Sequence, residues 1–158
     1  MFRQMRRKKQ EIPEDECKEI LTNELRGVIG VIGDDGYPYT LPLNHYYDKK
    51  SNKLYFHGAQ VGHKIDSIKN NSKVSYCVYD KGYTKEGEWS LNINSVIIFG
   101  KASIKNDENK IKKICYNIGH KFTDDENYLQ DEYETNYKRV LCFEIEIEHM
   151  TGKLVNES

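Results

Sequence analysis

Apolar and polar residues alternate strictly near the C-terminal end of the chain. Four aliphatic or aromatic residues occupy every second position from 141 to 147, and the positions that alternate with them are polar or small: Cys142, Glu144, Glu146 and Glu148. Successive side chains of a β-strand point to opposite faces of its sheet. The period of two therefore predicts a strand with one face buried and the other in water.

Five further β-rich runs precede this strand, at residues 27–33, 37–47, 53–57, 74–79 and 95–104. The first two flank Asp34-Asp35-Gly36, and a glycine in such a turn can take the positive φ that hairpins require. Pro38 and Pro42 lie inside the second run. Because proline cannot donate to a sheet ladder, that run is expected to contain a free or bulged stretch whose backbone a ligand can reach.

Helical spacing appears in three segments between these runs. Pro13, followed by three acidic residues, opens a short helix over about 13–24. A second short helix is predicted over 62–70, and residues 107–122 place apolar side chains on one helical face. The acidic segment 124–134 is either a linker or a further helix with a solvated face.

Hairpins dominate this order, and successive strands lack the helical crossovers of a parallel sheet. The pattern predicts a mainly β fold, an antiparallel barrel of six strands with peripheral helices. A chain of 158 residues is long enough for one domain with a real core. We therefore expect a single domain over 1–158, with residues 1–12 as a basic, solvated arm.

Composition narrows the class of protein. A net charge of −1 gives no global argument for nucleic acid, and no apolar run approaches the roughly 20 residues of a membrane helix. No apolar segment follows the basic N-terminus, so a secretory signal is not expected. The four cysteines, which are scattered and form no Cys-x-x-Cys pair, are Cys17, Cys77, Cys115 and Cys142. This scatter favours reduced thiols in a cytoplasmic protein, with neither a disulfide scaffold nor a metal site.

The most informative local pattern is the strand, loop and helix over 55–70. Gly58 and Gly62 lie in the loop, and Lys64 lies in the first turn of the expected helix. A helix start offers free N–H groups and a partial positive charge, so Lys64 with His57 and His63 suits a phosphate. The same residues also fit an ordinary polar loop, with a solvated lysine and a half-buried histidine. Neither a Walker motif nor Gly-x-Gly-x-x-Gly is present.

His45, between Asn44 and Tyr46, has two interpretations of equal weight. In the first, its side chain reaches a substrate that lies over a bound cofactor. In the second, it is an outward-facing strand residue. With His57 it is one of two candidate proton donors. No catalytic residue follows from the sequence beyond these two candidates.

Seven short segments in order carry a resemblance to a known family: Met5–Lys8, Asp34–Tyr39, Pro42–Asn44, Tyr55–Ala59, Gly62–Asp66, Ser95–Gly100 and Glu146–Lys153. Each is short, but their order and spacing span nearly the whole chain. In them the chain resembles the nitroimidazole-resistance (Nim) group of the pyridoxamine-phosphate-oxidase-like flavoproteins. This resemblance implies a split β-barrel and a homodimer with FMN at the subunit interface.

The resemblance also implies roles for individual residues. The second strand would border the flavin ring through Leu41, Pro42, Leu43 and Asn44. The end of the third strand would lie beside the ring and ribityl chain through His57, Gly58 and Ala59. His63 and Lys64 would bind the phosphate, and Ser95 would contact the cofactor or lie near the interface.

Two departures count against pyridoxamine phosphate as the substrate. The stretch Tyr39–Pro42 lacks the phosphate-binding arginine of true pyridoxamine-phosphate oxidases, and the C-terminal extension that binds pyridoxal phosphate is not evident. The expected activity is an FMN-dependent, nitroimidazole-reductase-like oxidoreductase that acts on a small nitroaromatic or quinone-like acceptor. The alternatives are a flavin- or haem-binding protein without robust turnover, with His45, His57 or His63 as an axial ligand, and a purely structural dimer.

Overall fold

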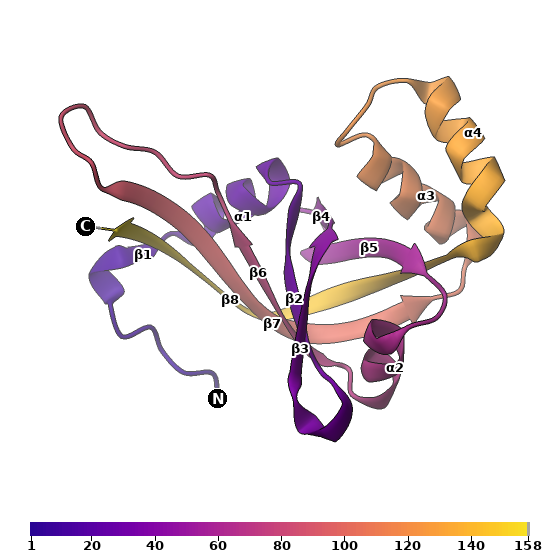
Figure 1. Ribbon diagram of the computed structural model, residues 1–158, viewed down its shortest axis with the longest axis horizontal. Coiled ribbons are helices and arrows are strands. Elements are labelled where there is room, and N and C mark those ends of the chain that lie inside the picture. The colour runs from indigo at the N-terminus through magenta and orange to yellow at the C-terminus, as the bar shows by residue number, and fades with distance from the viewer. Residues whose placement is uncertain (158) are drawn as a thin grey trace.

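The computed structural model describes residues 1–157, which form eight strands and four α-helices (Figure 1). The strands are β1 (Glu11–Ile12), β2 (Arg26–Ile32), β3 (Pro38–Asn44), β4 (Tyr46–Asp48), β5 (Lys53–Ala59), β6 (Lys73–Tyr79), β7 (Leu91–Lys105) and β8 (Val140–Glu157). The helices are α1 (Glu14–Asn23), α2 (His63–Asn70), α3 (Glu108–Gly119) and α4 (Glu126–Asn136). Short 3₁₀ turns cover Lys8–Gln10, Asp34–Gly36 and Tyr137–Arg139.

All strands belong to one antiparallel sheet, in the order β3-β2-β6-β7-β8-β5-β4, with β1 added at β8. The sheet is strongly curved, and β3 approaches β5 without pairing to it. This open seam confirms the expected split barrel. The described residues hold eight strands rather than six, because the chain changes partner at His45 and because part of the basic arm forms β1. Before His45 the chain pairs with β2, and after it the chain pairs with β5.

The predicted hairpin of β2 and β3 is confirmed, with Asp35 and Gly36 both at positive φ in its turn. Strand β3 pairs only with β2, so its other edge is free. This edge position explains how the strand tolerates Pro38 and Pro42, since a proline in a central strand would remove a ladder hydrogen bond.

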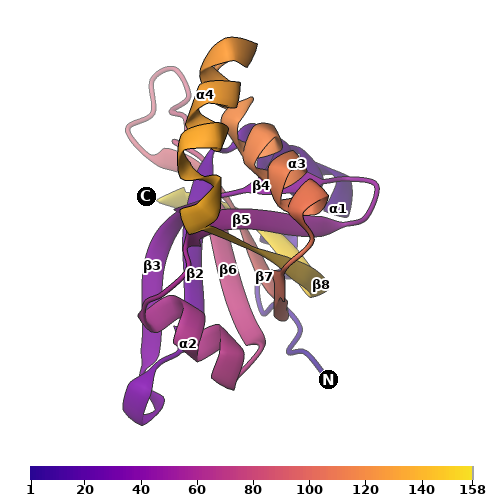
Figure 2. The same ribbon diagram turned by 90° about the vertical axis from the view of Figure 1, so that its right-hand side faces the viewer.

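Two apolar clusters hold the fold together. The larger fills the barrel and includes Phe56, Tyr76 and Phe143. The smaller lies outside the barrel, where Ile114 and Ile118 of α3 pack on β5 and β8. Both views show α3 and α4 at one side of β5 and α2 at the other (Figures 1 and 2).

The smaller cluster corrects the expectation for β8. The alternation predicts that Cys142 and Glu144 face water, but they are 0% and 4% exposed. Helix α3 covers the outer face of the strand there, and a pattern within one strand carries no information about what packs against it. Further along, Glu146 is exposed as predicted.

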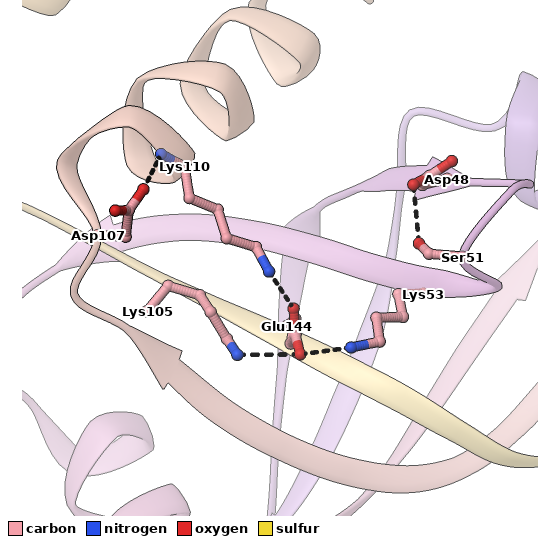
Figure 3. Close-up of polar contacts among 7 residues, drawn as sticks. All are labelled: Asp48, Ser51, Lys53, Lys105, Asp107, Lys110 and Glu144. Carbon is pink, nitrogen blue, oxygen red and sulfur yellow. Dashed lines mark hydrogen bonds and ion pairs between the residues drawn. The ribbon is translucent and has the colours of Figure 1, made fainter.

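Glu144 remains a charged residue in this buried place because three lysines surround its carboxylate (Figure 3). Nζ of Lys53, Lys105 and Lys110 lies 2.8, 2.9 and 3.1 Å from a carboxylate oxygen. Burial alone would raise the pKa of Glu144, but the three lysine hydrogen bonds outweigh it and hold the pKa at about 2. Lys110 lies in the first turn of α3, so the cluster ties the start of that helix to the sheet.

The N-terminal arm is docked at two points. The Phe2 ring stacks on His149 at 4.7 Å and on Phe99 at 5.7 Å, and β1 pairs with β8. The basic side chains between these points, from Arg3 to Lys9, are exposed. No helix in residues 1–157 is both long and apolar enough to cross a membrane.

Candidate functional site

Lys64 and Gly58 form the centre of the candidate site. A methyl group built on Gly58 would lie 3.2 Å from Nζ of Lys64, so the amino group rests over the bare backbone at the end of β5. Lys64 is half-buried, and within residues 1–157 it has neither an ion pair nor a hydrogen bond through Nζ. Burial lowers the pKa of Lys64 because no carboxylate compensates for the lost water. A partly desolvated cation without a counter-ion is suited to an incoming anion.

The N-terminus of α2 adds backbone donors beside this cation. Gly62 precedes the helix with a φ of 132°, a conformation that favours glycine, and no side chain caps the helix. In the first turn the Ile65 N–H donates to the Gly62 carbonyl oxygen at 2.9 Å, so among the described residues the N–H groups of His63 and Lys64 are the ones left without a backbone acceptor, and they carry the partial positive charge of a helix start. Lys64 and these donors together fit the terminal phosphate of a cofactor.

His57 lies on the outward face of β5, one residue before Gly58 and near enough to Lys64 for the lysine charge to act on its ring. Its ring is solvent-accessible and has no hydrogen bond within residues 1–157. Neighbouring protein atoms displace part of its water, and Lys64 adds positive charge nearby, so both effects lower the pKa of His57. The lowered pKa favours the neutral imidazole, and its ring nitrogens are open to a ligand.

The side chain of His63 is held elsewhere. Its ring stacks on Tyr39 at 4.2 Å, and its Nε2 accepts the backbone N–H of Asp34 at 3.2 Å. His63 thus fastens the start of α2 to the β2–β3 turn. Its backbone N–H, rather than its imidazole, is what this residue presents in the first turn of the helix.

The predicted site residues of β3 point to the two opposite faces of the strand. The side chains of Leu41 and Leu43 pack against the barrel core, whereas Pro42 is exposed. Leu41 and Leu43 can therefore contact a ligand through their backbone groups on the free edge of β3. Asn44, at the end of the strand, lines a cavity together with residues of β5.

That cavity has a volume of about 580 Å³ and lies between the end of β5 and the helices α3 and α4. The predicted residues that line it are Asn44, His57, Gly58 and Ala59. The opposite wall of the cavity was not predicted from the sequence; its side chains include Cys115, Tyr116, Phe122, Leu129, Tyr133 and Arg139. The available signal was the i, i+4 spacing of Leu129 and Tyr133 within the acidic segment, which forms α4 rather than a linker.

One predicted residue, Ser95, lies far from this site along the chain. Ser95 is ten positions along β7 from Lys105, which pairs through Cys142 with His57. At about 3.3 Å per residue this is a run of roughly 33 Å along the strand. Ser95 therefore does not meet the other predicted residues within the chain.

The expectation that His45 reaches a substrate, or faces outward, is wrong. The side chain is 0% exposed, with Nδ1 2.9 Å from the Tyr76 hydroxyl and Nε2 2.8 Å from the Leu21 carbonyl oxygen. Burial and the Lys121 cation lower its pKa to about 4. The residue falls where the chain crosses from β3 to β4, and α1 closes over it, so it is a buried structural group.

A family model supplies the relation to known proteins. Residues 13–154 match the family described as pyridoxamine 5'-phosphate oxidase. The chain belongs to this family. The match confirms the resemblance seen in the sequence and covers every element from α1 through most of β8. No curated protein sequence matches the chain.

Solved structures of similar fold include three from different bacteria. A candidate 5-nitroimidazole antibiotic resistance protein from Bacteroides thetaiotaomicron has a TM-score of 0.77 and 20% identity, over 93% of this chain and 87% of that one. An FAD-binding protein from Mesorhizobium loti has a TM-score of 0.65 and 24% identity, over 92% and 97%. An FAD- and haem-binding protein from Mycobacterium smegmatis has a TM-score of 0.72 and 15% identity, over 92% and 73%. At these identities the likeness establishes the shared fold.

Proposed function

We propose that this protein is an FMN-dependent oxidoreductase that passes reducing equivalents from a reduced donor to a small nitroaromatic or quinone-like acceptor. The observation that carries the proposal is the Lys64 ammonium group, which lies over Gly58 at the start of α2 with no counter-ion among residues 1–157. Family membership and the flavin named for several proteins of similar fold support a flavin as the ligand.

The chain's own residues would hold the cofactor in a defined order. Lys64 and the first-turn N–H groups of α2 would bind the phosphate, and His57, Gly58 and Ala59 would lie along the ribityl chain and ring. The free edge of β3 over Leu41–Asn44 would supply backbone groups to the ring. The flavin supplies the redox chemistry, and the protein supplies orientation, polarity and exclusion of water.

The cavity of about 580 Å³ beside His57 supports a small acceptor. Its helical wall is largely aromatic, with Tyr116, Phe122 and Tyr133, which suits a flat ring. His57 is the one remaining candidate proton donor, because His45 is buried. The lowered pKa of His57 makes its imidazolium form a stronger acid, so the ring can take up a proton and pass it to a bound acceptor.

We propose that the protein acts as a homodimer through the outer face of β6 and β7. Three large side chains on these strands are exposed there: Tyr79 at 58%, Ile97 at 43% and Phe99 at 41%. Exposed apolar side chains that lie close together are typical of a protein–protein interface, and a second copy of this chain would present the same apolar surface. Ser95 lies opposite Tyr79 on the same face, so it would be an interface residue, as the resemblance implies.

The direct test is the absorption spectrum of the purified protein, followed by titration of the cofactor-free protein with FMN and with FAD. We expect a yellow protein that prefers FMN, is bleached by NADH or NADPH and is re-oxidised by a nitroaromatic compound. A protein that neither carries nor takes up FMN would overturn the proposal. Tighter binding of FAD would overturn the choice of FMN while leaving a flavin site.

The second candidate function is haem binding without robust turnover. The specific observation in its favour is His57, an accessible imidazole with no hydrogen-bond partner in residues 1–157. This candidate predicts a Soret band when haem is added, with loss of that band in His57→Ala and no retention of flavin. Retained flavin and an unchanged haem spectrum would exclude it.

A further inference from the structure

Two of the four cysteines face each other behind the cavity wall. Sγ of Cys115 in α3 lies 4.0 Å from Sγ of Cys142 in β8, within the range of a sulfur hydrogen bond. Both thiols are free. The contact joins the helical wall of the cavity to the sheet, and neither thiol has a role in the function proposed above.

The two thiols differ in their access to solvent. Cys115 is partly exposed and lines the cavity, whereas Cys142 is 0% exposed in the cluster beneath α3. Cys142 also lies 4.0 Å from the carbonyl oxygen of Ile111, which is a second acceptor within reach of its single S–H. The hydrogen bond with Cys142 lowers the pKa of Cys115, while the same contact and burial raise that of Cys142. Cys115 is the reachable and more acidic thiol of the pair, and such thiols react first with oxidants.

We propose that Cys115 and Cys142 are a redox-active pair that forms a reversible intramolecular disulfide when a peroxide enters the cavity. The Cys115 sulfur attacks one peroxide oxygen, the O–O bond breaks, and one molecule of water or alcohol leaves. The resulting sulfenic acid on Cys115 is attacked by the Cys142 sulfur, the S–O bond breaks, and water leaves as the S–S bond forms. Two thiols lose two hydrogens in total, and the peroxide is reduced by two electrons; a dithiol reverses the step.

The bond would change the cavity. Forming it requires the two sulfurs to approach by about 2 Å, which draws Cys115 away from the cavity wall. Helix α4 and the loop before it lie between residues 115 and 142, so the oxidised chain would hold this whole wall to β8 by a covalent link. The state of the pair therefore sets the position of the wall that faces His57.

Peptide mapping tests the proposal on the full-length protein. The reduced protein is treated with hydrogen peroxide, quenched with a maleimide and digested. We expect a disulfide-linked peptide pair containing Cys115 and Cys142, a mass lower by two hydrogens, and recovery of both thiols with dithiothreitol. Cys77→Ser is the control, because Cys77 has no thiol neighbour in residues 1–157; this variant should form the bond as the parent does.

Two further variants separate the steps. Cys142→Ser should stop at the sulfenic acid on Cys115, trapped as its dimedone adduct, whereas Cys115→Ser should leave Cys142 reduced at the same peroxide dose. Over-oxidation of Cys115 in the parent protein without any linked peptide would overturn the proposal, and so would equal oxidation of Cys142 in Cys115→Ser. The measurement counts thiols, so it stands or falls independently of the flavin.

Discussion

Two histidines on opposite sides of the barrel wall show how this fold uses the same side chain in two ways. His45 is fully buried, and both of its ring nitrogens have a protein partner. His57 is accessible, has no such partner in residues 1–157, and lies beside the unpaired Lys64. A buried polar group must be satisfied within the protein, so His45 contributes to stability. An accessible unsatisfied group beside a cation remains available for a ligand.

The largest effect is expected for His45→Ala. The change leaves a cavity and removes partners from Tyr76 and from the Leu21 carbonyl, which lies in the interior. We expect the free energy of unfolding to fall by about 4 kcal/mol, measured by urea denaturation. The matched change His57→Ala should alter it by less than about 0.5 kcal/mol. Equal losses in the two variants would contradict the comparison.

The second effect is on acid stability. His45 has a pKa of about 4 in the folded protein against an ordinary value of 6.5, so the unfolded chain takes up a proton first as the pH falls. This contribution is fully present above about pH 6.5 and is lost as the pH falls to 4. This pKa shift corresponds to a loss of about 3 kcal/mol in the free energy of unfolding. Urea denaturation at several pH values between 6.5 and 4 measures it.

Glu144 also contributes to stability at low pH, but in a different pH range from His45, so the two contributions can be distinguished. Its pKa is also lowered, from 4.5 to about 2, so its contribution is lost in a lower window, as the pH falls from 4.5 through 2. Glu144→Gln should therefore leave the slope between pH 6.5 and 4.5 unchanged. A flat stability profile over that interval in the parent protein would contradict the burial of a neutral His45.

The third effect concerns the ligand side of the comparison. Lys64→Ala should weaken FMN binding about 30-fold, or about 2 kcal/mol, because a charge-assisted contact to the phosphate is lost. Stability should not fall, since Nζ of Lys64 has no partner to lose in the part of the chain that the structure describes. Lys69→Ala is the control: this lysine is exposed in the last turn of the same helix. Fluorescence titration with FMN measures both, and equal weakening would assign the effect to general charge.

The smallest effect is expected for Gly58→Ala. The added methyl group would lie 3.2 Å from Nζ of Lys64 and displace the flexible end of that side chain. We expect FMN affinity to fall about fivefold, or about 1 kcal/mol, with little change in stability. The sharper measurement is a double-mutant cycle, because Gly58→Ala should have no effect in a Lys64→Ala background. An undiminished effect there would mean that the methyl group acts on the ligand directly.

Local sequence signals were sufficient wherever the structure depends on neighbours along the chain. The alternation in β8, the Asp34–Gly36 turn and the glycine before α2 predict elements that the structure confirms. Local sequence signals gave wrong or incomplete predictions where a segment distant in sequence determines whether a residue is buried. Cys142 and Glu144 are buried by α3, and the acidic segment 124–134 forms a cavity wall as α4.

The amino-acid sequence is enough to predict the split-barrel family, the order of strands and helices, and the placement of Gly58, Gly62 and Lys64 around one strand-to-helix turn. These follow from short-range periodicity, turn chemistry and the order of short motifs. Two features depend on how the chain folds in space: His45 is buried while His57 is exposed, and Cys115 lies against Cys142 behind the cavity. The reason is physical: exposure and hydrogen-bond partners depend on contacts between residues far apart in the chain, and no local pattern records them.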